Sequence, residues 1–311
     1  MVRGPRPVFG GAGCRVEKNH GRRSSEAWVY VFPTLAYGAC RACGLDQRRN
    51  PCQFFSQPGI LARSNDTGVT PRGWRQPSPH RALDITEIPG IVEDYRKASE
   101  HAKAAGFDGV EVHAGNGYLP DQFLQDGVNR RTDMYGGSIE NRSRFLLQVM
   151  EALVSVWGGG NRVAVRIAPG GRWNGMSDSD PEALFDYVAN ELNQFGLAYL
   201  HIIEPRVRGN VVVAEGQYAI ASARLRKIFK GTIVAAGGFE PGTAEEVVEK
   251  GDADLVAFGR HFVANPDLPK RIRLGLPLNA YDRNTFYTFD ARGYTDYPFY
   301  EQRPESVTSA V

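Results

Sequence analysis

Residues 107–141 read FDGVEVHAGNGYLPDQFLQDGVNRRTDMYGGSIEN, and this stretch decides how the rest of the chain is interpreted. It begins with a short apolar strand over residues 109–112, which runs into a glycine-rich loop carrying His113, Asn116 and Tyr118. In α/β proteins a strand fixes the backbone while the loop that follows it presents chemical groups. A single histidine would favour the interpretation of an ordinary turn in which the hydrogen bonds of the side chain are satisfied. Three polar side chains within six residues favour a functional site.

Outward from this stretch, short apolar strands alternate with amphipathic helices from residue 83 onward. The pattern predicts a helix that starts at residues 86–89 and continues over 91–105 before the first strand, and another over 139–156 after it. Such alternation requires a parallel sheet covered by helices. Five strand–helix units, with no GxGxxG after a first strand, favour an α/β fold of the (β/α)8 TIM-barrel type over a doubly wound sheet. The remaining predicted elements are strands at 163–167, 200–203, 233–236 and 255–258, helices at 181–195, 217–229, 243–250 and 266–274, and inward-facing Phe145, Leu146, Val149 and Leu153.

The N-terminal part of the chain differs from the rest. Residues 1–80 are rich in Arg, Gly, Pro and Ser and show no sustained period of 2 or 3.6. Only residues 27–37 look like a buried strand, and Pro33 interrupts them. A complete barrel needs three strands from this part of the chain. We therefore expect residues 1–80 to form an atypical segment that need not be ordered, and residues 81–311 to carry five βα units of a barrel that can be incomplete.

Composition limits the class of protein. Hydrophobic residues make up 42% of the 311 residues and charged residues 23%, as in soluble globular proteins. A net charge of +2 gives no electrostatic case for a nucleic-acid or membrane partner. No window approaches the ~18 consecutive apolar residues of a membrane span, and the first residues lack the apolar core of a secretory signal. We expect a cytoplasmic protein.

Cysteine usage predicts neither a disulfide framework nor a metal site. Cys40 and Cys43 have CxxC spacing, but no second CxxC and no histidine pair follows. The pattern therefore favours reduced, incidental thiols and no metal. The four cysteines are Cys14, Cys40, Cys43 and Cys52.

Three further strand ends carry candidate chemistry. Arg166 lies one residue before the end of the strand at 163–167. An arginine there is costly to bury unless it meets an anion or a polar ligand; the alternative is a salt bridge to a neighbouring carboxylate. Gly237-Gly238 and Gly259-Arg260 follow the last two predicted strands. Glycines at consecutive strand ends let backbone N–H groups approach a phosphate, and an arginine can pair with it.

Several long motifs, in order, carry a resemblance to a known family. HAGNGYLPDQFLQDGVNRRTDMYGGSIENRSRFLLQVMEAL, VAVRIAP, IVAAGGF, ADLVAFGRHFVANPDLPKR and GYTDYPF resemble the Old Yellow Enzyme family, in its 12-oxophytodienoate-reductase and bacterial ene-reductase branches. The similarity covers residues 79–301. It implies an FMN-dependent (β/α)8 barrel that reduces the C=C bond of α,β-unsaturated carbonyl compounds with NADPH or NADH.

The resemblance also implies roles for individual residues. His113 and Asn116 would hold the carbonyl oxygen of the substrate, and Tyr118 would donate a proton. Arg166 would contact the flavin ring. The other residues carried over are Gly237, Gly238, Gly259 and Arg260 around the FMN phosphate, and Tyr297 and Phe299 at the rim of the active site. The expected partner is a small-molecule enone, and the expected state is a monomer or homodimer.

Two alternatives remain open on the sequence. The family places three strands before residue 107, and residues 1–60 show no good match to them, so the chain could be a non-catalytic remnant unable to retain FMN. The second alternative is an unrelated phosphate-binding barrel such as an aldolase-type lyase. That enzyme needs a Schiff-base lysine at a strand end, and none of the five predicted strands ends in lysine.

Overall fold

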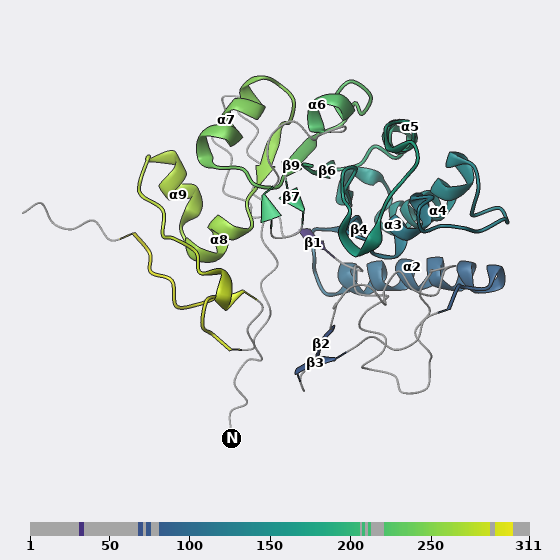
Figure 1. Ribbon diagram of the computed structural model, residues 1–311, viewed down its shortest axis with the longest axis horizontal. Helices are drawn as coiled ribbons and strands as arrows, with labels where there is room; N and C mark the ends of the chain where they lie inside the picture. Colours follow the sequence, from purple (N-terminus) through teal and green to yellow (C-terminus); the bar gives the residue numbers. More distant parts are fainter. Residues whose placement is uncertain are drawn as a thin grey trace, which may run out of the picture. The chain divides into compact units, whose positions relative to one another are not determined.

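The chain is organised as two compact units, Met1–Ala257 and Phe258–Val311, and each is considered by itself. Figure 1 shows the α/β arrangement of the first unit. The computed structural model describes residues 31–33, 68–70, 73–75, 81–205, 207–208, 211–212, 221–286 and 290–300.

The first unit contains a six-stranded sheet whose strands follow one another in chain order. Every neighbouring pair is parallel, in the order β1-β4-β5-β6-β9-β10. Parallel strands in chain order are what a (β/α)8 barrel requires. The strands are β1 (Val31–Pro33), β4 (Gly109–Ala114), β5 (Val163–Ile167), β6 (Tyr199–Ile203), β9 (Ile233–Ala236) and β10 (Leu255–Ala257).

The predicted strands at 163–167 and 233–236 are confirmed to the residue, and those at 200–203 and 255–258 to within one residue. The predicted end of the key strand at residue 112 is wrong. Pairing with β5 continues through His113 and Ala114, so His113 lies inside β4 rather than in the loop that follows it.

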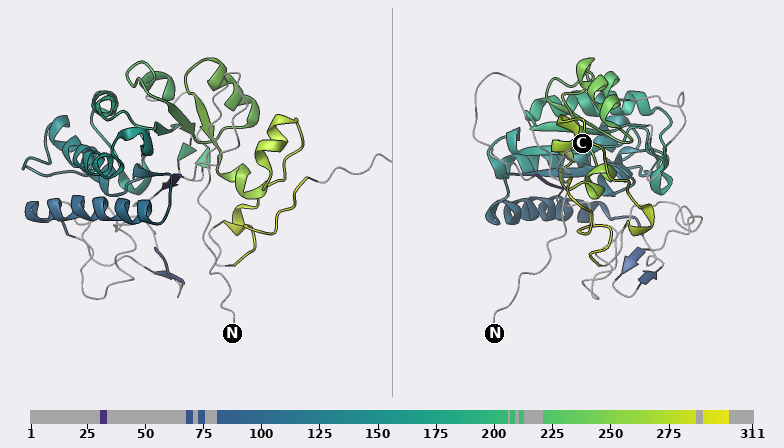
Figure 2. Two further views of the ribbon diagram at one scale, coloured as in Figure 1. Left: turned by 180° about the vertical axis from the view of Figure 1, so that it is seen from behind. Right: turned by 90° about the vertical axis from the view of Figure 1, so that its left-hand side faces the viewer.

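Helices follow each other around this sheet in chain order (Figure 1). The views in Figure 2 agree that α2 and α4 lie side by side. The predicted helices over 139–156 and 181–195 are confirmed, the latter as an α-helix that ends in a 3-10 turn. The helices are α2 (Ile88–Ala104), α3 (Leu119–Leu124), α4 (Ile139–Trp157), α5 (Pro181–Leu192), α6 (Ser222–Leu225) and α7 (Pro241–Glu249), with 3-10 turns η2 (Ile85–Glu87), η3 (Gly160–Arg162), η4 (Trp173–Gly175) and η5 (Asn193–Phe195).

Local sequence explains where these helices begin and end. Asp84 and Glu87 form a reciprocal capping box just before α2, and the Ser138 hydroxyl accepts from the backbone N–H of Asn141 at the start of α4. Helix α4 ends at Gly158, which adopts the left-handed conformation that favours glycine. The predicted helix over 217–229 is too long, because α6 ends at Leu225 and turns follow it. Its residues 217–220 lie outside the described part.

The core lies between the sheet and the helices outside it. One face of β4, β5 and β6 is entirely apolar and fully buried. The predicted inward-facing residues of α4 are confirmed, each with no exposed surface. An apolar strand face rich in Val and Ile is typical of parallel strands covered by helices. The residues concerned are Val110, Val112, Val163, Val165, Ile167, Leu200 and Ile202 on the strands, and Phe145, Leu146, Val149 and Leu153 on α4.

The N-terminal part contributes to this sheet. Strand β1 pairs with β4, so the strand predicted within residues 27–37 is confirmed for Val31–Pro33. Pro33 occupies the last strand position opposite Glu111, where a residue without a backbone N–H is tolerated. Two short antiparallel hairpins were not predicted: β2 (Gly68–Thr70) with β3 (Gly73–Arg75), and β7 (Val207–Arg208) with β8 (Val211–Val212). All four cysteines lie outside the described residues.

The second unit contains short helices and an extended tail. The helix predicted over 266–274 corresponds to α9 (Leu268–Arg273), and α8 (Arg260–Ala264) precedes it, followed later by the 3-10 turn η6 (Arg283–Thr285). Arg271 is almost fully buried and donates to the carbonyl of Pro298, which holds the tail against α9. In the part of the chain that the structure describes, no helix is long and apolar enough to cross a membrane.

Candidate active site

Polar side chains share one face of the sheet, opposite the apolar face. His113, Arg166 and His201 lie in one row across β4, β5 and β6, because the strand register pairs His113 with Arg166 and Arg166 with His201. Two residues earlier on the same face, Glu111 and Tyr199 flank Ala164. Paired positions in a sheet point to the same side. The predicted His113 and Arg166 are therefore brought together at the carboxyl ends of their strands, where barrel enzymes place their active sites.

His113 is a buried, neutral imidazole. It is 9% exposed, and its Nδ1 has no hydrogen-bond partner among the described residues. Burial, and after it the charge of Arg166, lowers the pKa of His113 to about 4. Its ring lies beside that of Tyr118, with 5.1 Å between the ring centroids. A neutral imidazole with an unused nitrogen is suited to hydrogen-bond a ligand atom.

Asn116 and Tyr118 are presented by a tight turn directly after β4. The N–H of Tyr118 donates to the carbonyl of Gly115 at 3.2 Å, and the two central residues, Asn116 and Gly117, have φ of 57° and 76°. Positive φ at both central positions defines a type I′ turn, for which Asn-Gly is the preferred sequence. The turn brings Asn116 and Tyr118, both half-buried, to the same strand end as His113.

Arg166 is available to a ligand. Its Nε is buried without a hydrogen-bond partner, and its guanidinium makes no ion pair with any other described residue. The alternative of a salt bridge to a neighbouring carboxylate is therefore not found in this part of the chain. A half-buried guanidinium without a direct ion-pair partner is unfavourable, so its surroundings fit an electron-rich group such as a flavin ring.

A buried acid–base pair that was not predicted lies next to Arg166 in the sheet. The Nδ1 of His201 lies 2.9 Å from Oε2 of Glu111, and both side chains are buried. Burial opposes ionisation of Glu111, but the charge and hydrogen bond of His201 outweigh it and keep the pKa of Glu111 below its usual range. Burial lowers the pKa of His201. The sequence did contain a signal for this pair, because Glu111 and His201 are polar residues inside otherwise apolar strands.

The glycines after β9 adopt conformations that other residues avoid. Gly237 and Gly238 have φ of 115° and 66°, which L side chains rarely adopt. A backbone of this kind can approach a phosphate closely. Gly259 caps α8 with ordinary negative φ, so its conformation does not by itself require glycine. Arg260 donates from Nη1 to the Tyr281 hydroxyl at 3.4 Å. Gly259 and Arg260 belong to the second unit, and a phosphate site shared by all four residues stays a prediction.

The two predicted rim residues also lie in the second unit. The hydroxyl of Tyr297 accepts a hydrogen bond from the backbone N–H of Asp282 at 2.9 Å. Phe299 is 66% exposed, which is unusual for a large apolar side chain. Their role in binding substrate stays a prediction.

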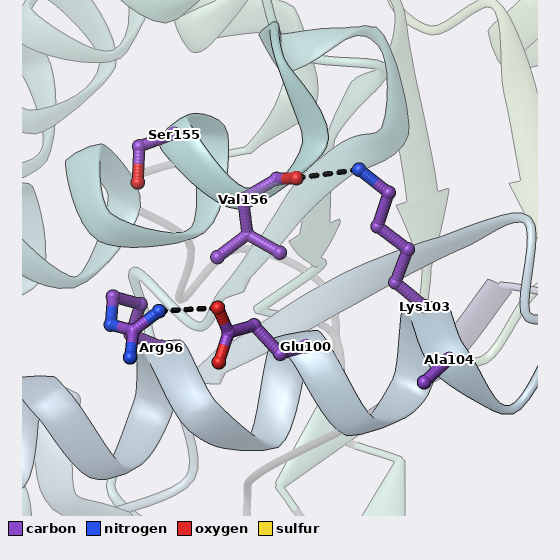
Figure 3. Close-up of a pocket in the computed structure, with 6 residues that line it drawn as sticks. All are labelled: Arg96, Glu100, Lys103, Ala104, Ser155 and Val156. Carbon is purple, nitrogen blue, oxygen red and sulfur yellow. Dashed lines mark hydrogen bonds and ion pairs between the residues drawn. The ribbon is translucent and has the colours of Figure 1, made fainter.

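A surface depression between α2 and α4 is not a second candidate (Figure 3). Arg96 is paired with Glu93 and Glu100, and Lys103 donates to the carbonyl of Val156 at 2.7 Å. The depression lies where α2 and α4 run towards the amino ends of β4 and β5, the end of a barrel that serves stability. The cationic side chains of Arg96 and Lys103 in this depression therefore already have partners.

Comparison with known proteins agrees with this geometry. Residues 57–279 match the family model of the NADH:flavin oxidoreductase / NADH oxidase family. The chain is 49% identical over 301 residues to putative 12-oxophytodienoate reductase 5 of Oryza sativa subsp. japonica, covering 93% of this chain and 78% of that protein. It is 49% identical over 256 residues to 12-oxophytodienoate reductase 2 of Arabidopsis thaliana, covering 82% and 67% of the two chains.

Solved structures are similar as well. Morphinone reductase has a TM-score of 0.72 at 45% identity, covering 81% of this chain and 67% of that one. The Old Yellow Enzyme homologue from Zymomonas mobilis has a TM-score of 0.72 at 36% identity, covering 80% and 68%.

Fold and site together define an α/β-barrel enzyme with its active site at the carboxyl ends of the strands. The chain belongs to the NADH:flavin oxidoreductase / NADH oxidase family, whose structural relatives include Old Yellow Enzymes. The expected fold, the FMN cofactor and the NAD(P)H-dependent reduction of activated C=C bonds are thereby confirmed. The alternative of an unrelated lyase-type barrel is therefore wrong. None of these comparisons supports the other alternative, a non-catalytic remnant.

Proposed function

We propose that this chain reduces the C=C bond of an enone of the 12-oxophytodienoate class, with His113 and Asn116 binding the carbonyl oxygen and Tyr118 donating the proton. One observation carries the proposal. The type I′ turn after β4 gathers an amide, a phenol and a neutral imidazole at one strand end, with the His113 and Tyr118 rings 5.1 Å apart.

The chemistry of enone reduction requires these three groups. As hydride adds to the β-carbon, negative charge develops on the carbonyl oxygen. Two N–H donors, from His113 and Asn116, stabilise that charge where it forms, and removal of one such donor raises the barrier by roughly 3 kcal/mol. The α-carbon then needs a proton, and a phenol such as Tyr118 can act as the general acid. Because the pKa of His113 is lowered to about 4, it acts as a neutral donor at physiological pH.

The residues of the first unit fit a flavin. The unpartnered Nε of Arg166 and the left-handed glycines Gly237 and Gly238 are features that a planar anionic ring and a phosphate would use. Arg166 would contact the ring, and Gly237 and Gly238 would approach the phosphate, together with Gly259 and Arg260. FMN, when bound, supplies hydride transfer from the nicotinamide cofactor to the substrate.

Phenol titration of the yellow enzyme tests the carbonyl site, because a phenolate oxygen mimics the oxyanion. In Asn116→Asp the turn survives, since Asp also tolerates positive φ, but the amide donor becomes a carboxylate. We expect phenol to bind on the order of 100-fold more weakly, the equivalent of about 3 kcal/mol. Asn190→Asp, on the exposed surface of α5, introduces the same charge away from the site as a control. Unchanged phenol affinity in Asn116→Asp would exclude the proposed role.

Three finer properties are part of this proposal. The hydride donor is NADH or NADPH. Morphinone reductase, 45% identical to this chain, has been solved in complex with tetrahydroNAD, which makes NADH the first donor to test. Flavin reduction rates with the two nucleotides distinguish them. The cytoplasmic location and the monomeric or homodimeric state are checked by cell fractionation and by light scattering.

A further inference from the structure

The turn that carries Asn116 is held from its C-terminal side by a buried carboxylate. Oδ2 of Asp121 accepts from the backbone N–H of Gly117 at 2.8 Å, and Oδ1 accepts from Nε2 of Gln125 at 2.8 Å. Asp121 lies in α3 and has no exposed surface. A buried carboxylate is costly unless its hydrogen bonds are needed, so this carboxylate points to a requirement on the turn.

The same turn is held through the carbonyl of Asn116. Nδ2 of Asn174, in the loop after β5, donates to that carbonyl at 2.9 Å. Asn116 and Asn174 have φ of 57° and 56°, and among the described residues they are the two non-glycine positions with positive φ. Such strained residues persist only where surrounding contacts fix them. The hydrogen bond joins the two strained positions directly.

The loops after β4 and β5 are also joined beyond this contact. The N–H of Gly127 donates to the carbonyl of Ser177 at 2.8 Å, and the N–H of Ser179 donates to Asp126 at 2.9 Å. A Cβ on Gly115 would lie 2.8 Å from the Cβ of Ala168, so glycine is what lets the loops approach. The loop that carries Asn174 is thereby held against the turn.

We propose that Asp121 and Asn174 are positioning residues that hold the Asn116 carboxamide at the carbonyl site. The inference rests on the proposed role of Asn116. Asp121 fixes the peptide that follows Asn116, and Asn174 fixes its carbonyl, so together they set the direction of its side chain. Misplacement of a binding group by about 1 Å can reduce rates on the order of 100-fold.

The test uses variants that delete each contact without forbidding the backbone. Asn174→Gly keeps the left-handed conformation and removes the donor. Asp121→Leu removes the acceptor, while Asp121→Asn retains an oxygen for the N–H of Gly117. We expect phenol affinity and enone-driven re-oxidation to fall about tenfold in Asn174→Gly and Asp121→Leu. In Asp121→Asn we expect both to stay within about twofold, which is rescue by the conservative variant.

Ser179→Ala is the matched control, because it loosens the same two loops without touching the turn. Flavin content and thermal unfolding are measured for every variant. Altered unfolding temperatures with unchanged phenol affinity in both Asn174→Gly and Asp121→Leu would overturn the inference and leave a structural role. Loss of affinity in Ser179→Ala as large as in Asn174→Gly would overturn it as well. If Asn116→Asp itself leaves phenol binding intact, the proposed function fails instead.

Discussion

His113 and Arg166 occupy paired positions on β4 and β5, so a permanent cation lies beside the imidazole that we propose for the carbonyl site. Burial together with this charge lowers the pKa of His113 to about 4. The pairing therefore has two consequences. It adds to burial in keeping the imidazole neutral, and it places a guanidinium where, in the proposed site, a reduced, electron-rich ring would be stabilised.

The low pKa of His113 predicts a pH dependence of stability. Between about pH 6.5, the usual value of an unfolded histidine, and about pH 4, the unfolded chain binds the proton and the folded chain does not. The free energy of unfolding should therefore fall as pH decreases through this window, by up to about 1.4 kcal/mol per pH unit. Urea unfolding at pH 5 and 7 measures it. His113→Gln should lose this dependence, whereas His101→Gln, exposed on α2, should keep it.

The raised pKa of Asp121 predicts a pH dependence of stability with the opposite sign. Burial raises the pKa of Asp121 to about 7, although hydrogen bonds from Gln125 and Gly117 oppose the shift. Between its ordinary value near 3.8 and about 7, the folded chain holds the proton and the unfolded chain does not. The contribution of Asp121 to the free energy of unfolding should therefore decrease as pH rises through this window. The stability of Asp121→Asn relative to wild type should therefore increase as the pH is raised from 5 to 8. A difference in the free energy of unfolding that does not change with pH would contradict this.

Glu111→Gln tests the buried pair with His201. The variant leaves Arg166 without its nearest balancing charge and weakens a charge-assisted hydrogen bond. We expect the free energy of unfolding to fall by about 2 kcal/mol. Glu93→Gln makes the same change in a partly exposed ion pair with Arg96, which water screens, so its effect on the free energy of unfolding should be much smaller. Equal effects of the two variants in urea unfolding would mean that the buried pair carries no special weight.

Tyr118→Phe separates the two halves of the catalytic cycle. Without the phenol, re-oxidation by enone should slow by roughly 100-fold or more, because general acid catalysis is lost. Flavin reduction by NADPH needs no such proton and should stay nearly intact. Stopped-flow absorbance follows both steps, with Tyr187→Phe on α5 as the control. Equal losses in both half-reactions would remove Tyr118 from the role of proton donor.

Gly115→Ala tests the close approach of the loops after β4 and β5. The new Cβ would lie 2.8 Å from the Cβ of Ala168 and 3.0 Å from its backbone nitrogen, so the turn must shift. We expect a loss of about 1–3 kcal/mol in the free energy of unfolding, with weaker phenol binding. Gly90→Ala, where a Cβ meets nothing within 4 Å, should not destabilise the chain. Wild-type phenol binding in Gly115→Ala would show that the approach is unimportant for the site.

Strands and helices were predicted correctly where the local sequence decides the structure. Strand β9 is a continuous apolar run and β5 is apolar except for Arg166, as buried parallel strands often are, and both were predicted to the residue. The position of His113 was not predicted correctly. A polar residue ends the apolar run in the sequence, whereas the backbone pairing of the strand continues through it. Helix α3 was missed because its six residues are too short for a periodic signal.

The sequence alone determined the family and the α/β class, through motifs and alternating strands and helices that span most of the chain. It also predicted that His113, Asn116 and Tyr118 act together, because these three residues lie within one strand and one Asn-Gly turn. Tertiary structure decided what surrounds them. Glu111 and His201 are 90 residues apart, and Asn116 and Asn174 are 58 apart. Burial and neighbouring charge depend on such distant partners, and they set which groups are neutral, ionised or held in place.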